Sequence, residues 1–161
     1  MMKKEYWGGR IIVREATIED GYGVAEKMRK ADQKELWSAF RLSPFEGVVD
    51  SIYKSTLAYS VELDGKVVAV LGIVPLNLVA RSGVIWLLGT DELDRLGITF
   101  GRYTRPYLKE FIKEWDYLEN WVHEGNSKSL NWLKMGGFTI EPPEPFGIDK
   151  ENFCRIWLKG E

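Results

Sequence analysis

One histidine and one cysteine are the only residues of these two types in this chain of 161 residues. A lone cysteine forms no internal disulfide, which fits a reducing compartment. One histidine and one cysteine are too few for a His/Cys zinc site. Cys154 lies within the apolar run Phe153–Leu158. We therefore expect it to be a packed thiol and not a nucleophile.

An excess of either charge is also missing. The 22 Lys and Arg residues and the 24 Asp and Glu residues are interspersed and leave a net charge of −2, so we expect no nucleic-acid partner. The longest apolar run, Val67–Leu76, contains a glycine and a proline and is too short to span a bilayer. Lys3 and Lys4 are not followed by the apolar segment of a signal peptide. These absences predict a cytoplasmic protein without a membrane span.

The chain has ample material for a hydrophobic core. Apolar residues make up 45% of it and aromatic residues 13%, which argues against disorder. No repeat, low-complexity segment or linker divides the sequence. The pattern indicates a flexible leader over residues 1–9, which ends at Gly8-Gly9, and a single domain over residues 10–161.

Hydrophobic spacing and turn residues predict the elements of the first third of the chain. A strand over 11–16 leads through Thr17 into a helix that runs to about Ala31. Residues 33–42 are left open between a helix and a mobile loop. Ser43 and Pro44 are typical of a helix N-cap and the position after it, so we expect a second helix that runs to about Ser55.

The remaining elements follow from alternation, turns and helical periodicity. The turn Asp64-Gly65 is typical of a two-residue hairpin between two strands. We expect strands over 57–63, 66–74, 78–88, 118–122, 138–140 and 153–158, a long helix from Thr99 or Phe100 to Trp115, and a helix over 126–135. This order predicts an α/β (α+β) fold with a mixed, mostly antiparallel sheet of about seven strands and helices on both faces. It disfavours a doubly wound nucleotide fold, in which strands and helices alternate throughout.

Two segments resemble the GNAT family of N-acetyltransferases. The opening Ile12–Asp20 looks like the first strand and turn of that family. The family's late helix typically begins with Asn, carries a small residue one turn later and ends in Gly-Phe, and Asn126, Ser129 and Gly137-Phe138 stand at these positions. The resemblance implies a GNAT-like fold and, if the protein is active, transfer of an acyl group from acetyl-CoA to the amine of a small molecule or a protein.

A second resemblance runs from Trp86 to Leu158. This part of the chain is similar to a phage branch of the same fold, which includes internal virion proteins of short-tailed phages. The similarity consists of scattered positions: Trp86, Thr90-Asp91, Arg95-Leu96, Trp115, Trp121-Val122, Gly125-Asn126 and Leu133-Lys134. It implies a phage or prophage protein that works with phage proteins, in a virion or in the cytoplasm of a bacterial host.

In GNAT enzymes a Gln/Arg-x-x-Gly-x-Gly/Ala loop opens the long helix, and its amides meet the pyrophosphate of acyl-CoA. The resemblance therefore implies these cofactor-binding residues: Arg95, Gly97, Thr99, Gly101 and Arg102. The spacing of the two glycines departs from the family pattern, and Asp91, Glu92 and Asp94 place like charges beside the expected anion. The loop is thus degenerate, and an ordinary strand-to-helix turn with solvated arginines is the other explanation.

Three positions concern catalysis. Many GNAT enzymes carry a tyrosine general acid in the late helix, and Leu133, which stands at that position, cannot donate a proton. His123 follows the strand over 118–122 and is the candidate general base, or else a partly exposed residue that ends the strand. Asn126 is an N-cap residue or, as the resemblance implies, a contact to the pantetheine arm of the cofactor.

Trp37 and Phe40 lie between the first two helices, where the resemblance implies a wall of the acceptor site. We expect both side chains to be packed, because tryptophans within predicted elements are most simply core residues. The same expectation covers Trp86, Trp121, Trp132 and Trp157. Exposure of Trp37 and Phe40 would instead suggest an apolar partner or substrate.

Two functions follow from these residues. The degenerate loop and Leu133 favour a weakly active or non-catalytic acetyltransferase-like protein with a virion, assembly or interaction role. The complete element order and Asn126–Phe138 support the alternative, a functional acetyl-CoA-dependent N-acetyltransferase. Whether the chain is an enzyme stays open, and no metal ligand set is expected.

Overall fold

A computed structural model describes residues 3–6 and 8–160, apart from the side chains of residues 6, 98–100, 103, 104 and 111. Within these residues the chain forms nine strands and five helices. In chain order they are β1 (Lys4–Tyr6), β2 (Ile11–Glu15), α1 (Ile18–Glu26), α2 (Lys30–Phe40), α3 (Pro44–Lys54), β3 (Leu57–Leu63), β4 (Lys66–Asn77), β5 (Ser82–Gly89), α4 (Asp91–Glu114), β6 (Tyr117–His123), α5 (Ser127–Met135), β7 (Thr139–Ile140), β8 (Glu144–Phe146) and β9 (Glu151–Lys159).

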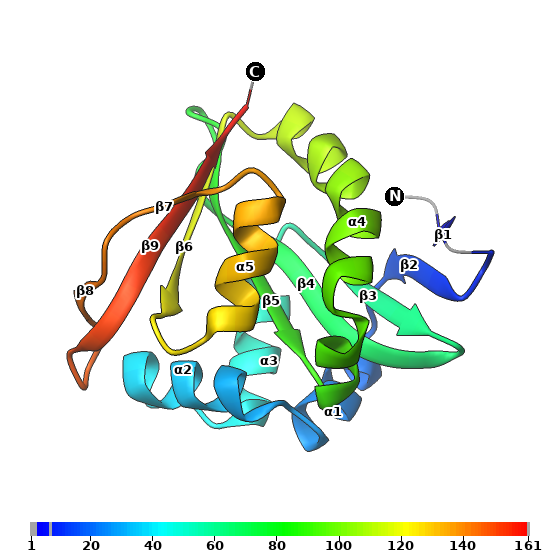
Figure 1. Ribbon diagram of the computed structural model, residues 1–161, viewed down its shortest axis with the longest axis horizontal. Coiled ribbons are helices and arrows are strands. Elements are labelled where there is room, and N and C mark those ends of the chain that lie inside the picture. The colour runs from blue at the N-terminus through cyan, green and yellow to red at the C-terminus, as the bar shows by residue number, and fades with distance from the viewer. Residues whose placement is uncertain (1–2, 7, 161) are drawn as a thin grey trace.

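All strands join one sheet in the order β1-β2-β3-β4-β5-β6-β9-β7, with β8 also paired to β9 (Figure 1). The β5–β6 pair is parallel, and the other described pairs are antiparallel. The parallel pair spans only Ser82–Val84 against Tyr117–Glu119. The two strands therefore part over most of their length, and this is where the sheet opens.

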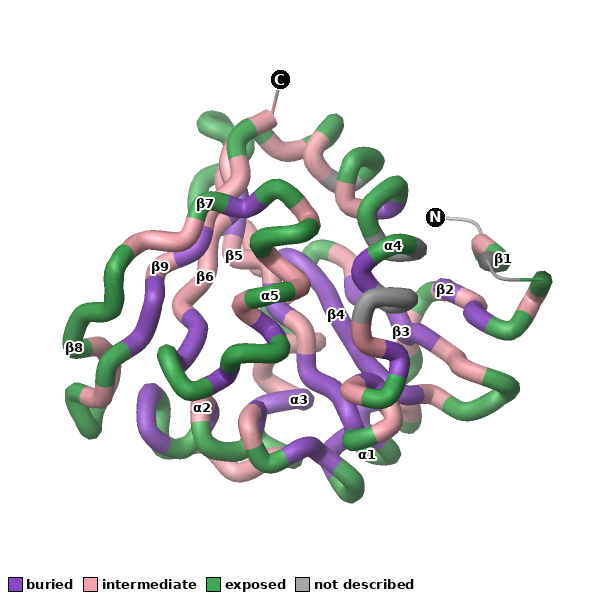
Figure 2. The backbone as a smooth tube through the Cα atoms, viewed as in Figure 1, coloured by how far each residue is buried: buried purple, intermediate pink, exposed green. Residues whose placement is uncertain are grey.

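Helices cover both faces of the sheet, as predicted. On one face, Val24 of α1 and Val48 of α3 pack with Trp86 of β5. On the other face, Leu93 and Tyr107 of α4 pack against β2, β3 and β4. Figure 2 shows buried residues along β4, which runs through the centre of the sheet. The expected fold class is confirmed, with nine strands in place of about seven.

Local signals explain the elements that were predicted closely. Ser43 accepts a hydrogen bond from the Glu46 amide and Pro44 opens α3, so the expected cap is present. Asp64 and Gly65 both have positive φ, 49° and 83°, as the favoured two-residue hairpin turn requires. In these places the structure depends on residues a few positions apart.

The first helix was predicted too long. It ends at Glu26 instead of about Ala31, because the next residues turn toward β5. Met28 forms an isolated antiparallel bridge with Thr90, and the Arg29 amide donates to the Gly89 carbonyl at 2.9 Å. A second helix, α2, then covers the segment that the sequence left open.

Two further boundaries differ from the prediction, and two strands were not predicted. The long helix begins at Asp91 and not at residue 99 or 100, and Gly97 interrupts it with non-helical angles of φ 48° and ψ −124°. The third strand of the meander begins at Ser82 instead of residue 78, because residues 78–81 form the turn. Strands β1 and β8 were not predicted, and β1 lies within the expected leader.

Trp37 and Phe40 are exposed, by 53% and 55%, so the prediction that they are packed is wrong. The physical reason is helical spacing, since α2 buries Leu36 and Ala39 and turns the other two outward. Phe40 still contacts Phe146 edge to face, with 6.1 Å between ring centroids. Of the four tryptophans expected in the core, Trp86 is buried and the others are half-buried. In the described part of the chain, no helix is both long enough and apolar enough for a bilayer crossing.

Gly147 provides a test of how the loop after β8 docks on α2. A Cβ there would lie 2.4 Å from Ala39 Cα, and its φ is +77°. Gly147→Ala should cost about 2–4 kcal/mol of unfolding free energy, from left-handed strain and overpacking together. Gly65→Ala is the matched control, because its φ is +83° and nothing lies within 4 Å; it should cost only about 1–2 kcal/mol. Equal losses in urea unfolding would mean that the close approach contributes nothing.

Candidate functional site

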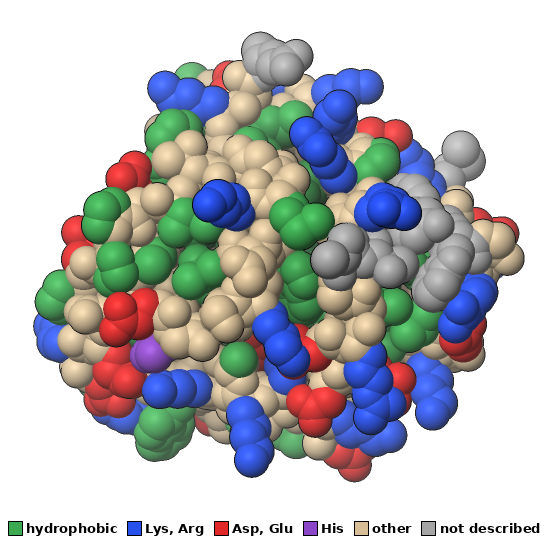
Figure 3. All heavy atoms as spheres, viewed as in Figure 1, with side chains coloured by type: hydrophobic (Ala, Val, Ile, Leu, Met, Phe, Trp, Pro, Cys, Tyr) green, Lys and Arg blue, Asp and Glu red, His purple; other side chains and the backbone are tan. Residues whose placement is uncertain are grey.

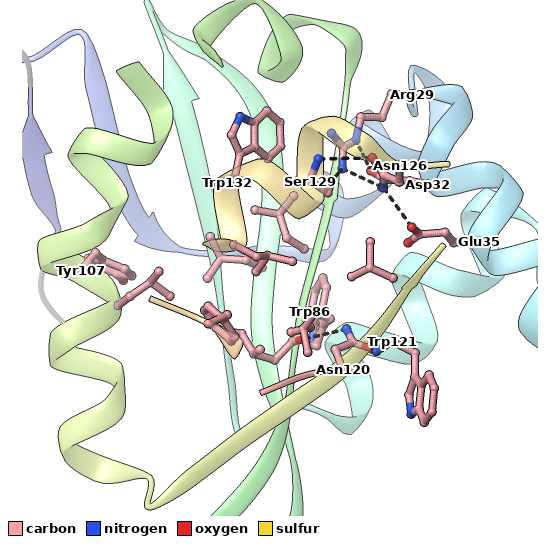
Figure 4. Close-up of a pocket in the computed structure, with 18 residues that line it drawn as sticks. Arg29, Asp32, Glu35, Trp86, Tyr107, Asn120, Trp121, Asn126, Ser129 and Trp132 are labelled. Atoms are coloured by element: carbon pink, nitrogen blue, oxygen red, sulfur yellow. Dashed lines mark hydrogen bonds and ion pairs between the residues drawn. The ribbon is translucent and has the colours of Figure 1, made fainter. Parts of the chain in front are cut away.

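The site lies where β5 and β6 part. Beyond Val84 and Glu119 the strands no longer pair, and a cavity of about 140 Å³ opens between them and continues under α4 and α5 (Figure 4). One side chain crosses the gap, since Asn120 of β6 donates to the Ile85 carbonyl of β5 at 2.6 Å. The cavity thus follows from a parallel pair that is joined at one end only.

The walls of the cavity are mostly apolar, and its polar groups other than Asn120 gather at one end (Figure 4). The apolar lining consists of Leu71, Ile85, Trp86, Leu87, Tyr107, Leu108, Trp121, Val122, Trp132, Leu133, Phe138 and Ile156. The polar lining consists of Arg29, Asp32, Glu35, Asn120, Asn126 and Ser129. An apolar pocket with a few convergent polar groups is the usual form of a small-molecule site.

Arg29 is the centre of the polar end. Its Nε and Nη2 donate to the two oxygens of Asp32 at 2.7 and 2.9 Å, a bidentate ion pair. Its Nη1 donates to Asp94 of α4 at 2.9 Å and its Nη2 to Ser129 of α5 at 2.8 Å. The guanidinium also lies 5.1 Å from the centre of the Trp132 ring. This Arg29 network joins the start of α2 to α4 and α5.

The network is buried, and its donors and acceptors are paired. Arg29 is 3% exposed and Asp32 is 1% exposed. Asp32 also accepts the Gly89 amide at 2.8 Å, so it holds the end of β5 as well. Burial raises the pKa of Asp32, while Arg29 and the Gly89 amide oppose that rise. A buried ion pair with these hydrogen bonds is costly to break, because either partner left alone is an uncompensated charge.

Glu35, one turn after Asp32, is the acidic group that the sequence did not single out. Its Oε1 accepts the His123 amide at 3.0 Å and Asn126 Nδ2 at 2.9 Å. Burial, with the charge of Asp32 second, raises the pKa of Glu35 to about 7. The sequence signal that could have found Glu35 was its spacing of one helical turn from Asp32. That signal was not used, because the conformation of residues 33–42 was left open.

His123 lies at the end of β6, and its ring does not line the cavity. Its Nδ1 accepts the Gly125 amide at 3.0 Å, which assigns the proton to Nε2. Nε2 then donates to Glu151 at 3.2 Å. Both ring nitrogens are therefore engaged with neighbours of the strand end, and only the backbone amide of His123 reaches Glu35.

Of the residues expected to bind the cofactor, those described in the loop and start of the long helix do not line the cavity. Arg95 lies 3.7 Å from Glu92, and Arg102 is exposed. Gly97 forms the break in α4, and Gly101 is buried beside Met135. None of these four described residues lines the cavity. Thr99 belongs to the same prediction, and its side chain lies outside the described part of the chain.

Asn126 does line the cavity and caps α5. Its Oδ1 accepts the Ser129 amide at 3.4 Å, so the predicted N-cap is confirmed. Leu133 also faces the cavity, at the position where the resemblance would have a tyrosine. Cys154 is buried, and burial raises the pKa of its thiol, as expected for a packed side chain. Among the described residues, no three His, Cys, Asp or Glu side chains are arranged to hold a metal ion.

Solved structures of similar fold include acetyltransferases. Ribosomal-protein-S5-alanine acetyltransferase from Vibrio fischeri has a TM-score of 0.71 and 14% identity, over 100% of this chain and 98% of that one. Spermidine N-acetyltransferase from Vibrio cholerae, in complex with CoA and spermine, has a TM-score of 0.69 and 15% identity, over 94% of this chain and 96% of that one. A GNAT-family acetyltransferase from Bacillus anthracis has a TM-score of 0.70 and 13% identity, over 99% of both chains. No protein-family model matches the chain, and no curated protein matches it by sequence. The chain therefore has the GNAT acetyltransferase fold.

Removing the charge at the centre of the network should be costly. Arg29→Met keeps much of the side-chain volume but leaves Asp32 buried without its cation, so we expect a loss of about 3–5 kcal/mol in unfolding free energy. Arg95→Met is the control, since this side chain is 77% exposed, and it should change stability by no more than about 0.5 kcal/mol. Similar losses for both variants in urea unfolding would contradict the importance of the network.

Glu35 predicts a pH dependence of stability. Because its folded pKa is about 7, above its ordinary value of 4.5, the folded state holds a proton that the unfolded state releases, and stability falls as pH rises between these values. Glu35→Gln mimics the protonated form, so its melting temperature should exceed that of the parent by a few degrees at about pH 8 and match it at about pH 4. The exposed control Glu26→Gln should show no such divergence. If the difference in melting temperature between Glu35→Gln and the parent is the same at about pH 4 and about pH 8, the pKa of Glu35 is not raised by folding.

Proposed function

We propose that this GNAT-fold chain is a weakly active or non-catalytic relative of the acetyltransferases that works by binding rather than by efficient acyl transfer. The observation that carries the proposal is the Arg29 network between the first turns of α4 and α5. It lies on the route that an acyl-CoA arm would have to follow.

The resemblance implies that acyl-CoA would place its pyrophosphate at the start of the long helix and its arm beside Asn126. Such an arm would run between the starts of α4 and α5. There Arg29 links Asp94 to Ser129, and Lys128 lies 3.7 Å from Asp94 at the surface. Opening this route means parting the buried Arg29 guanidinium from Asp94 and Ser129, which costs free energy and lowers affinity accordingly.

The surface around the expected phosphate site also opposes an anion. The first turn of α4 carries three carboxylates, Asp91, Glu92 and Asp94. These carboxylates already interact with the positive end of the helix dipole, so a phosphate there would gain less from it. On the described part of the face that carries α4 and α5, Lys and Arg side chains lie scattered among acidic ones without a continuous basic patch (Figure 3). Leu133 removes the usual general acid, a loss that typically lowers rates by about 10²- to 10⁴-fold.

We further propose that the chain acts in assembly or interaction as a phage or prophage protein, in a virion or in the host cytoplasm, through a single domain over residues 10–161. The support is the sequence resemblance from Trp86 to Leu158. The exposed aromatic side chains of Trp37 and Phe40 are consistent with an interaction surface. Finding the gene outside any phage or prophage neighbourhood would count against this role.

A second candidate is an acetyl-CoA-dependent N-acetyltransferase on a small-molecule or protein amine. Two observations favour it. The cavity sits where the strands part, and α4 is broken at Gly97, so its second part begins with a helix N-terminus, the kind of end that can bind an anion. In this candidate Glu35, with a pKa of about 7, is better suited than His123 to be the general base, because it lines the cavity.

Calorimetry with acetyl-CoA separates the two candidates. For the proposed function, the intact chain should show no saturable binding up to about 1 mM ligand. A dissociation constant below about 100 μM, together with acetylation of a polyamine or peptide amine that Glu35→Gln slows by about 100-fold or more, would establish the enzyme instead. Glu26→Gln is the control for the turnover assay, because Glu26 is exposed and does not line the cavity.

A further inference from the structure

The buried and half-buried charges at the polar end of the cavity do not balance. Three carboxylates, Asp32, Glu35 and Asp94, gather around one buried cation, Arg29. The hydrogen bonds of Arg29 go to Asp32, Asp94 and Ser129, and Lys128 approaches Asp94 from the surface. Glu35 is therefore the carboxylate of this group without a cation at salt-bridge distance among the described residues.

One oxygen of Glu35 is also unused. Its Oε1 accepts two neutral donors, from His123 and Asn126. Both printed hydrogen bonds of Glu35 end on Oε1, so Oε2 has no hydrogen-bond partner among the described residues. Figure 4 shows the carboxyl group turned toward Asn126 and Asp32. A charged group with open acceptor sites in an apolar pocket is costly to leave unpaired, and a donor with positive charge would remove that cost.

The size and walls of the cavity restrict what such a donor can be. A volume of about 140 Å³ is close to that of an apolar cavity that holds benzene, so there is room for a ring-sized ligand of roughly six to nine heavy atoms. Trp86 and Trp132 provide aromatic walls, while Tyr107 lies at the end of the cavity far from Glu35 (Figure 4). Aromatic faces attract cations. A delocalised cation is more weakly hydrated than an ammonium group and enters such a site at lower cost.

The fold already binds one group of this kind in the same place. The Arg29 guanidinium pairs with a carboxylate and lies over the Trp132 ring, 5.1 Å from its centre. Glu35 repeats the carboxylate part of this arrangement one turn along α2, beside the aromatic lining, and lacks the cation. The chemistry of the missing partner is thus indicated by a neighbour within the same cavity.

We propose that the cavity between β5 and β6 binds a small planar amidinium or guanidinium compound, whose N–H groups bond to Glu35 and whose apolar body lies against the aromatic walls. The ligand is held and not acylated. This inference rests on the proposed function, because the Arg29 network that keeps the acyl-CoA arm out is also what leaves a separate, ring-sized cavity.

The test is a titration of the full chain with benzamidine and with its neutral analogue benzamide, at about pH 8. Benzamidine should bind at least about 10-fold more tightly than benzamide to the parent chain. Glu35→Gln should remove this preference while leaving benzamide binding unchanged, and Glu26→Gln should keep the preference. Equal binding of the two compounds, or a preference that survives in Glu35→Gln, would overturn the proposal.

Acetyl-CoA titrated into the same samples distinguishes this inference from the function on which it rests. If acetyl-CoA binds saturably and benzamidine blocks that binding, the Arg29 network does not keep acyl-CoA out. The cavity would then be part of the cofactor site, which contradicts the proposed function. Absence of benzamidine binding in a sample that also fails to bind acetyl-CoA would overturn the ligand and leave the proposed function standing.

Discussion

The buried ion pair between Arg29 and Asp32 is the interaction on which the site depends. It lies at the start of α2 and reaches Gly89 at the end of β5, Asp94 in α4 and Ser129 in α5. Together with the Met28–Thr90 bridge and the Arg29 amide, it holds the segment between α1 and α2 against the open end of the sheet. Its desolvation cost is offset because every charged atom involved finds a hydrogen-bond partner.

The same interaction shapes the polar end of the gap between β5 and β6. In this chain the parallel pair is joined at one end and leaves space between β5 and β6. A spermidine N-acetyltransferase of similar fold has been solved with CoA and spermine. Here the space has a polar end closed by charges and an apolar body walled by aromatic rings. The fold provides the space, and the side chains placed in it determine its use.

Local signals made part of the fold and site predictable. The Ser43 cap, the Asp64-Gly65 turn and the Asn126 cap each depend on residues within one turn, and all three are present. The early end of α1 was not predictable in this way, because it depends on a bridge from Met28 to Thr90. His123 was a reasonable candidate from its residue type, yet a strand end and the turn after it direct its ring away from the cavity.

What the sequence by itself determined is the architecture and one chemical absence. Its periodicities and turns are enough for a mixed sheet between two helical layers, and Leu133 cannot act as an acid in any conformation. Only the tertiary structure decided which charges meet. Arg29 and Ser129 lie 100 positions apart, and the pKa of Glu35 depends on burial by segments far along the chain. Hydrogen bonds within a turn are encoded locally, whereas the desolvation of a charge depends on everything that packs around it.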